Sequence, residues 1–448
     1  MRAVPAYLPG SLSERPQPPP PSPPARLDHR TRSDGRVLAR SSLTVAGRLV
    51  SKLAIVAFLV LAARLLTKEE YGLYSYVLVL AGTFAILADP QVTVIAGRDV
   101  SSGRHSAAAS YWSAFPVVVA TGALGAAAML VFALLAPGPG ETAAVLLVAA
   151  GYVVANRVAG LGLDMLRALG RLGTEAAVET AGTLALIAAA TAVAAAGLGV
   201  SAVLGVFLAH AILTALACHV LLRADIRRPQ RVPGYRRELV GTGIKLALSA
   251  GATAIATRGP LIVLGVGGSA LAVASFSAGL RFADALYMLA LTAGQALLPS
   301  IASMRSTDPA RATRLVRKAI ALATVAGGAL AVAVAPFGAQ ITSAVFGSAY
   351  ASSGPLMAAM MASVPFMGML WISWFALCAW HRERDVLRVA CACAPGCLLA
   401  AILVIPRAGA HGAAWVYVGA IAVLALGTYL IFERAVRDPR TAPALVPA

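Results

Sequence analysis

The sequence has little charge and few aromatic residues for its length. Only 12% of its 448 residues are charged and 59% are apolar, whereas soluble domains carry about 25% charged residues. This composition excludes a soluble globular protein. Aromatic residues make up 6%, while Ala, Gly, Leu and Val dominate, as in membrane helices that pack through small residues. Alternating strands of about ten residues are absent, so we predict an all-α integral membrane protein.

Reactive groups are also scarce. All five cysteines lie inside apolar runs. Cys391, Cys393 and Cys397 have no histidine or carboxylate inside their run, so we interpret them as packing residues and expect neither a metal site nor a disulfide. The sequence has no P-loop, nucleophile elbow or paired-histidine motif. We therefore expect no enzyme, no cofactor and no ATP hydrolysis.

Twelve apolar stretches are long enough to cross a bilayer, which takes roughly 20 residues of α-helix. Short turns, such as PGPG at 137–140, separate them. The predicted spans are residues 45–66, 72–97, 108–136, 142–166, 173–197, 200–222, 239–265, 271–299, 317–337, 353–379, 386–405 and 411–432.

The distribution of basic residues supports this count. Of the 37 Lys and Arg residues, 29 lie in alternate inter-span segments: 1–48, 98–104, 167–171, 223–237, 305–318, 382–388 and 434–440. The opposite ends of the spans hold only Arg64, Lys68 and Arg407. The positive-inside rule then places both termini in the cytoplasm. The net charge of +18 therefore reflects topology, and we expect no nucleic-acid partner.

The basic segment after the sixth span divides the chain into two sets of six. We predict a disordered, Pro-rich, basic tail at 1–44, which contacts membrane lipids. Two six-helix bundles follow at 45–223 and 239–434, joined by a cytoplasmic linker at 224–238, and a cytoplasmic tail occupies 435–448. The sequence Lys-Leu-Ala begins at both Lys52 and Lys245, in spans one and seven, which suggests parallel repeats related by an axis along the membrane normal.

Several motifs resemble the polysaccharide flippase family of the multidrug/oligosaccharidyl-lipid/polysaccharide (MOP) superfamily. The turn EEYGLY at 69–74 leads into a span that ends in LAD at 87–89 and is followed by Arg98. Pro90 and Gln91 stand where that family usually has Leu-Gly. Three later stretches agree with the family: SFSAGLRFADALYMLALTAGQALLPSIA at 275–302, VFGSAY at 345–350 and IPRAGAHGAAWVY at 405–417. One departure is that Gly259 or Pro260 replaces the Asp that commonly ends span seven.

The resemblance implies transport of an undecaprenyl-pyrophosphate-linked oligosaccharide from the inner to the outer leaflet of a bacterial plasma membrane. It also implies alternating access between two six-helix bundles, with a polysaccharide polymerase and glycosyltransferases as partners. Alternatives are a cation-coupled multidrug exporter, a lipid II flippase, which usually has fourteen spans, and a membrane glycosyltransferase or polymerase. The short predicted loops disfavour the last of these.

A pyrophosphate that crosses hydrocarbon needs cations in a hydrated cavity. Lys52, Lys245 and Arg281 lie deep in spans one, seven and eight, so we predict a cationic cleft formed by them, with Arg258 as a weaker candidate. The two lysines can alternatively extend to the inner surface.

A second set of deep charges has structural or coupling roles in this interpretation. Asp89 precedes Pro90, which predicts a bend near the inner end of span two, and it pairs with Arg98 or with a neighbouring helix. Arg281 and Asp284 share a helical face and can pair with each other. The members of this set are Asp89, Arg98, Arg157, Asp164 and Asp284, and Arg157 and Asp164 are expected to pair.

Overall fold

The computed structural model describes residue 55 and residues 57–140, 142–230, 232–380 and 382–437. These residues form helices and no strand. Residues 57–65 are helical and precede α2. The further elements are α2 (Lys68–Leu87), α3 (Val92–Ser101), α4 (Ala107–Leu135), α5 (Ala143–Ala168), α6 (Leu172–Ala195), α7 (Gly199–Ile226), α8 (Tyr235–Gly267), α9 (Ala270–Thr307), α10 (Pro309–Val334), η1 (Ala335–Phe337), α11 (Gly338–Phe346), η2 (Ser348–Ser353), α12 (Gly354–Met361), α13 (Val364–Ala379) and α14 (Glu383–Arg437).

The helices agree with the predicted spans. Nine helices of the described residues are long and apolar enough to cross a membrane, or ten if the pair that is bent by 45° between Met361 and Val364 forms one span. The long element α14 covers both of the last two predicted spans. Its backbone is not helical at Gly409, which separates the two spans. Most of the predicted first span lies outside the described residues. The architecture is therefore all-α, and its helix count is consistent with twelve spans.

Span two is broken where the sequence predicts a bend. α2 begins with a capping box, in which the Thr67 hydroxyl accepts from the Glu70 N–H at 3.2 Å and the Glu70 carboxylate accepts from the Thr67 N–H at 2.9 Å. It ends at Leu87, just before Asp89 and Pro90, because proline lacks the N–H that the helix ladder needs and crowds the preceding turn. Gln91 adopts a left-handed φ of 52° and α3 begins after it.

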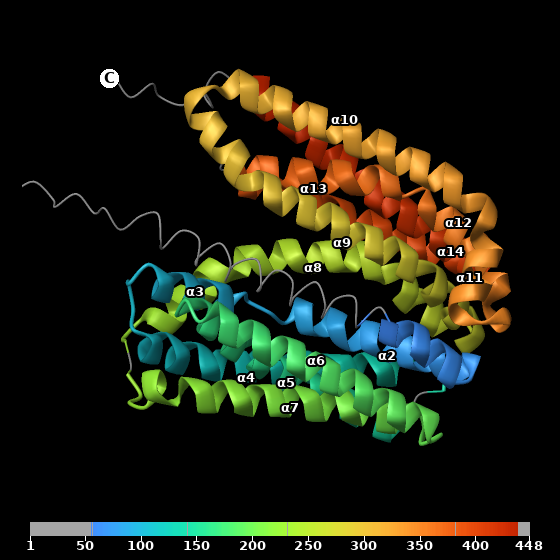
Figure 1. Cartoon of the computed structure of the whole chain (residues 1–448), viewed down its shortest axis with the longest axis horizontal. Helices are drawn as coiled ribbons and strands as arrows, with labels where there is room; N and C mark the ends of the chain where they lie inside the picture. The colour runs from blue at the N-terminus through green and yellow to red at the C-terminus, as the bar shows by residue number, and fades with distance from the viewer. Residues whose placement is uncertain (1–54, 56, 141, 231, 381, 438–448) are drawn as a thin grey trace, which may run out of the picture.

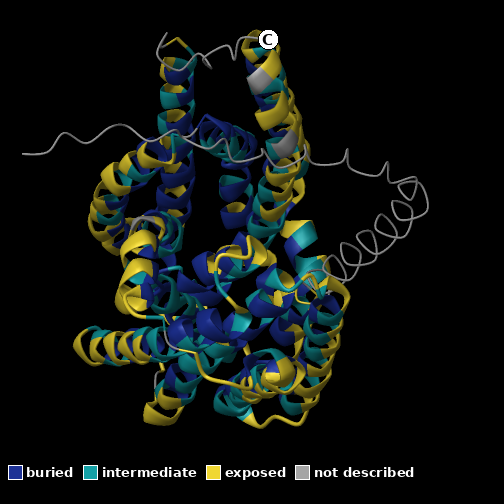
Figure 2. Ribbon diagram, turned by 90° about the vertical axis from the view of Figure 1, so that its left-hand side faces the viewer, coloured by how far each residue is buried: buried dark blue, intermediate teal, exposed yellow. Residues whose placement is uncertain are grey.

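Two groups of helices face each other across α8 and α9 (Figure 1). One contains α2–α7, and the other contains α10 and α12–α14. The groups lie closest at the end where α2 begins, which we call the Lys68 end, and diverge toward the opposite end, which we call the Tyr235 end (Figure 1). The division of the chain at 224–238 stays a prediction. Many residues on the outward faces of the helices are exposed (Figure 2). Large apolar residues are among the exposed ones, such as Leu135 at 81% and Val332 at 77%, as expected for helices that face lipid.

Close helix contacts depend on glycine. A Cβ on Gly72 of α2 would overlap the Ala270 carbonyl oxygen of α9. A Cβ on Gly243 of α8 would overlap the Pro90 carbonyl oxygen at the break in span two. Larger residues at either position would separate the helices, so these glycines fix how closely α2 approaches α8 and α9.

Candidate functional site

Two arginines lie at similar depth where the helix groups meet. Arg281 of α9 follows Ala270 by eleven residues, or about 16 Å along the helix axis. Arg258 of α8 precedes Gly267 by nine residues, or about 14 Å. Both therefore lie near the middle of a hydrocarbon layer about 30 Å thick. A guanidinium there costs roughly 2.5–3.5 kcal/mol on insertion scales, so two of them indicate a functional role or a specific partner.

One carboxylate, that of Asp284, pairs with Arg281 and lies near enough to Arg258 to act on it electrostatically. Arg281 Nη1 lies 3.5 Å from an Asp284 carboxylate oxygen, which confirms the pairing that the sequence predicted. Asp284 also acts electrostatically on Arg258. The Arg258 guanidinium packs against the backbone of α2, because a Cβ on Gly82 would lie 2.8 Å from its Nη1. Two guanidiniums with one carboxylate leave this part of the interface with a net positive charge.

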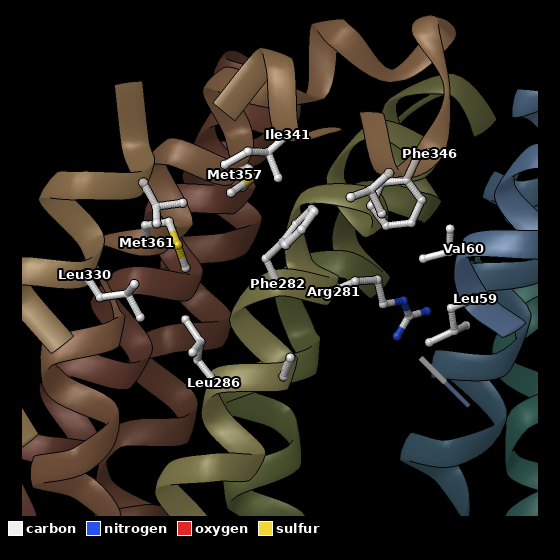
Figure 3. Close-up of a pocket in the computed structure, with 13 residues that line it drawn as sticks. Leu59, Val60, Arg281, Phe282, Leu286, Leu330, Ile341, Phe346, Met357 and Met361 are labelled. Atoms are coloured by element: carbon white, nitrogen blue, oxygen red, sulfur yellow. The ribbon is translucent and has the colours of Figure 1, made fainter. Parts of the chain in front are cut away.

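Arg281 also borders an apolar cavity of about 350 Å³. The Arg281 side chain extends from α9 toward Leu59 and Val60, which precede α2 (Figure 3). Its exposed fraction is 18%, and its Nε makes no hydrogen bond of normal geometry to a described residue. The remaining lining side chains are apolar and come from α9, α10, α11 and α12, among them Phe282, Leu286, Leu330, Ile341, Met357 and Met361 (Figure 3). A charged group thus adjoins a cavity that fits an apolar ligand segment.

Asp89 pairs with a neighbouring helix, which was one of its two predicted alternatives. Its carboxylate forms an ion pair with Arg157 of α5, and the two side chains are only 12% and 11% exposed. The same carboxylate accepts hydrogen bonds from the Gln91 backbone N–H at 2.7 Å and from its side-chain amide at 2.9 Å. The break in span two is therefore held to α5 by a nearly buried ion pair.

The predicted pairing of Arg157 with Asp164 is wrong. Seven helical residues rise about 10 Å, which is too far for the two side chains when a nearer carboxylate is available across the helix contact. Asp164 instead pairs with Arg167 at 2.8 Å, and Arg167 also binds the buried Glu175 of α6 at 2.6 Å. The sequence did hold a signal for the correct pair. Asp89 lies twelve residues before the end of α3 and Arg157 lies eleven residues before the end of α5, so both stand at a similar distance from the same side of the membrane.

Arg98 lies away from this interface. Its guanidinium is 3.1 Å from Asp99, the next residue in the chain, and its side chain is 60% exposed. Asp99 accepts a hydrogen bond at 3.0 Å from the hydroxyl of Tyr235, the first residue of α8. Arg104 forms a further link, at 2.7 Å, to Glu238 of α8. These contacts join the start of α8 to α3 and to the turn before α4.

The two predicted lysines cannot be placed. Lys52 lies outside the described residues. Lys245 lies on α8, but its side chain is likewise outside the described part of the structure. Their roles in a cationic cleft therefore stay predictions.

Tyrosines near the arginines were missed as site residues. Tyr71 and Tyr74 of α2 act electrostatically on Arg281, and Tyr287 of α9 and Tyr417 of α14 act on Arg258 or Asp284. Tyr71 and Tyr74 belong to the EEYGLY motif at 69–74, which by itself indicates a turn and not a binding site. Their proximity to Arg281 depends on the packing of α2 against α9, which no local pattern reveals.

Comparison with known proteins identifies relatives of this arrangement. The profile of the family described as "Polysaccharide biosynthesis protein" matches residues 37–305, which is more than half of the chain. No curated protein sequence matches the chain significantly.

Solved structures of similar fold cover most of the chain. A lipid II flippase, MurJ, in an inward closed conformation has a TM-score of 0.69 and 13% identity, with 87% of each chain covered. A MOP superfamily transporter from Pyrococcus furiosus has a TM-score of 0.57 and 16% identity, with 89% of this chain and 95% of that chain covered. An outward-facing multidrug resistance MATE transporter has a TM-score of 0.54 and 16% identity, with the same two coverages.

At such low identity, the structural likeness shows a shared fold alone. The family profile is the finding that confirms the resemblance inferred from the sequence motifs. This chain belongs to the polysaccharide biosynthesis protein family and has the fold of MOP superfamily transporters.

Proposed function

We propose that this protein flips a polyprenyl-pyrophosphate-linked oligosaccharide from the inner to the outer leaflet by alternating access. The observation that carries the proposal is the presence of two arginines, Arg258 and Arg281, beside the single carboxylate of Asp284 between the two helix groups. A pyrophosphate needs such cations inside the membrane. The apolar cavity beside Arg281 suits the prenyl chain next to the phosphate.

The orientation follows from the basic residues. Segments at the Tyr235 end hold most of the Lys and Arg residues, so this end faces the cytoplasm, and the Lys68 end faces outward. Both termini are then cytoplasmic, in the plasma membrane of a bacterium. The helix groups are closest at the Lys68 end and diverge at the Tyr235 end (Figure 1), so in this proposal the Lys68 end is the one that has to open for release to the outside. Glycosyltransferases would supply the substrate in the cytoplasm, and a polymerase would use the product outside.

The sign of the charge disfavours drug export. A positively charged drug would be repelled by Arg258 and Arg281. The nearby carboxylate of Asp284 is already paired with Arg281. A site of net positive charge instead favours an anionic substrate.

Charge reversal at Arg281 tests the proposal. Arg281→Glu would place two carboxylates beside each other in a low-dielectric site, so we expect export of the lipid-linked oligosaccharide to be lost while the protein still inserts. Arg281→Lys should retain part of the activity, since a point charge still attracts phosphate without the bidentate geometry. The measurement is surface polysaccharide in cells that depend on this transporter.

The matched control is Arg314→Glu on α10, because Arg314 is exposed at the Tyr235 end. This variant should export normally. Normal export by Arg281→Glu would contradict the proposed cationic site, and the Arg281–Asp284 pair would then have a structural role only.

A further inference from the structure

Buried polar groups whose hydrogen-bonding capacity is not satisfied line the contact between α2 and α9, where the Tyr71 hydroxyl lies near the Arg281 guanidinium and interacts with it. Four of them are fully buried, and Tyr350 of η2 is only 2% exposed. The hydroxyl oxygens of the tyrosines and serines, and Nε of the arginine, make no hydrogen bond of normal geometry to another described residue. We call this set the tyrosine seam: Tyr71, Tyr74, Ser75, Ser277, Arg281 and Tyr350.

The seam runs from the Lys68 end to the arginine site. The Tyr350 and Tyr71 rings are in edge-to-face contact with centroids 5.8 Å apart, and the Tyr71 and Tyr74 centroids are 6.3 Å apart. On α9, Ser277 and Arg281 follow Ala270 by seven and eleven residues, so all three share one helical face. Ala270 contacts Gly72 of α2. Arg281 therefore lies about 16 Å along α9 from Ala270, at the deep end of these hydroxyls.

The seam contributes less free energy to the contact between α2 and α9 than apolar side chains would. Buried hydroxyls that lack partners cost free energy that apolar side chains of similar shape would not. The polar contacts at this end include side-chain bonds to carbonyl oxygens, which water can replace. Arg64 Nε donates to the Val345 carbonyl at 2.8 Å, and Lys68 Nζ donates to the Ala349 carbonyl at 3.0 Å. The unpaired groups thus favour a second state in which the Lys68 end is open and they bind a ligand.

The chemistry of the seam indicates the ligand. Five of its six residues are neutral and carry hydroxyl groups, and each hydroxyl both donates and accepts hydrogen bonds. Three of these hydroxyls sit on tyrosine rings, which offer flat apolar faces beside a polar group. Sugar rings present the same combination of hydroxyls and apolar C–H faces. A phosphate would instead favour cations, and Arg281 is the one cationic residue of the seam.

We propose that the tyrosine seam binds the saccharide of the lipid-linked substrate once the Lys68 ends of the helix groups separate. Arg281 then holds the phosphate at the deep end, and the saccharide lies along the hydroxyls toward the outside. This inference rests on the proposed function, because Arg281 is shared by both.

The test compares two synthetic ligands on the purified full-length protein. One is a short-chain prenyl pyrophosphate, and the other carries a disaccharide of N-acetylglucosamine on the same pyrophosphate. The variant Tyr71→Phe/Tyr74→Phe/Ser277→Ala removes three hydroxyls and keeps both rings. We expect the unaltered protein to bind the saccharide ligand at least about tenfold more tightly, a ratio well within reach of a few hydrogen bonds. The triple variant should bind both ligands equally.

Two controls separate binding from folding. Ser373→Ala on α13 removes a hydroxyl that is equally buried and also lacks a partner among the described residues, and it should keep the tenfold preference. The thermal unfolding midpoint of the triple variant should stay nearly unchanged, because none of the removed hydroxyls makes a hydrogen bond of normal geometry in the closed contact.

The possible outcomes distinguish the inference from the proposed function. A triple variant that keeps the preference, or unaltered protein that binds both ligands equally, would refute the saccharide site and leave the flippase proposal standing. Failure of the unaltered protein to bind either pyrophosphate would refute the proposed function itself. Equal loss of both ligands in the triple variant, with a lowered unfolding midpoint, would show that the hydroxyls act through the fold, and would also overturn the inference.

Discussion

The ion pair between Asp89 and Arg157 should stabilise the protein because it is nearly buried. We consider Asp89→Asn and Arg157→Met, separately and together. Each single change leaves the other charge without its partner in a site where both side chains are about nine-tenths buried. Removal of one partner from such a pair costs roughly 3–5 kcal/mol. The double variant leaves no charge behind, so it should be less destabilised than the sum of the single variants by about 1–3 kcal/mol.

Equilibrium unfolding of the purified protein in mixed micelles measures these differences. Asp89→Asn keeps an acceptor for the Gln91 N–H, so the comparison isolates the charge from the local turn. The control pair is Arg104 and Glu238, whose side chains are 50% and 43% exposed at 2.7 Å. Solvent screens such a pair, and Arg104→Ala should leave the unfolding transition in place. Additive destabilisation at Asp89 and Arg157 would refute the reasoning, because it would mean that the two charges do not depend on each other.

Further predictions concern topology and the contact at the Lys68 end. Reporter fusions after Arg237 and after Pro137 should report opposite sides of the membrane, and the same side for both would invalidate the twelve-span arrangement. Gly72→Ala should impair export without loss of insertion, because its Cβ would overlap the Ala270 carbonyl oxygen and hold α2 away from α9. The control Gly160→Ala adds a Cβ with no neighbour within 4 Å and should export normally; equal effects of the two changes on surface polysaccharide would argue against a closing contact at Gly72.

Helix positions could be predicted closely because the bilayer sets their length. The predicted span at 108–136 is α4 (Ala107–Leu135), and the predicted span at 173–197 is α6 (Leu172–Ala195). The break after Leu87 was also predictable, since Pro90 acts locally on the backbone. The bend between α12 and α13 was not predicted, although Pro365, the second residue of α13, lacks the N–H that would bond to the Met361 carbonyl.

The partners of charged residues were harder to predict than the helices. Pairing of Arg281 with Asp284 depends on spacing within one helix, and that prediction is confirmed. Pairing of Arg157 depends on which helix packs against α5, and the local expectation of Asp164 is wrong. The tyrosine seam belongs to the same class, because Tyr71 and Ser277 are 206 positions apart in the sequence and lie along one contact only after α2 packs against α9.

The contact between Gly243 and Pro90 limits how α8 can move. One turn earlier on the same face of α8 stands Leu239, and one turn later stands Ala247. A shift of α8 along its axis by one turn, about 5.4 Å, would drive one of these side chains into the Pro90 carbonyl oxygen. Axial sliding is therefore blocked in both directions, whereas tilting about the small contact point is not. We therefore expect α8 to tilt about the contact at Gly243 rather than to slide along it.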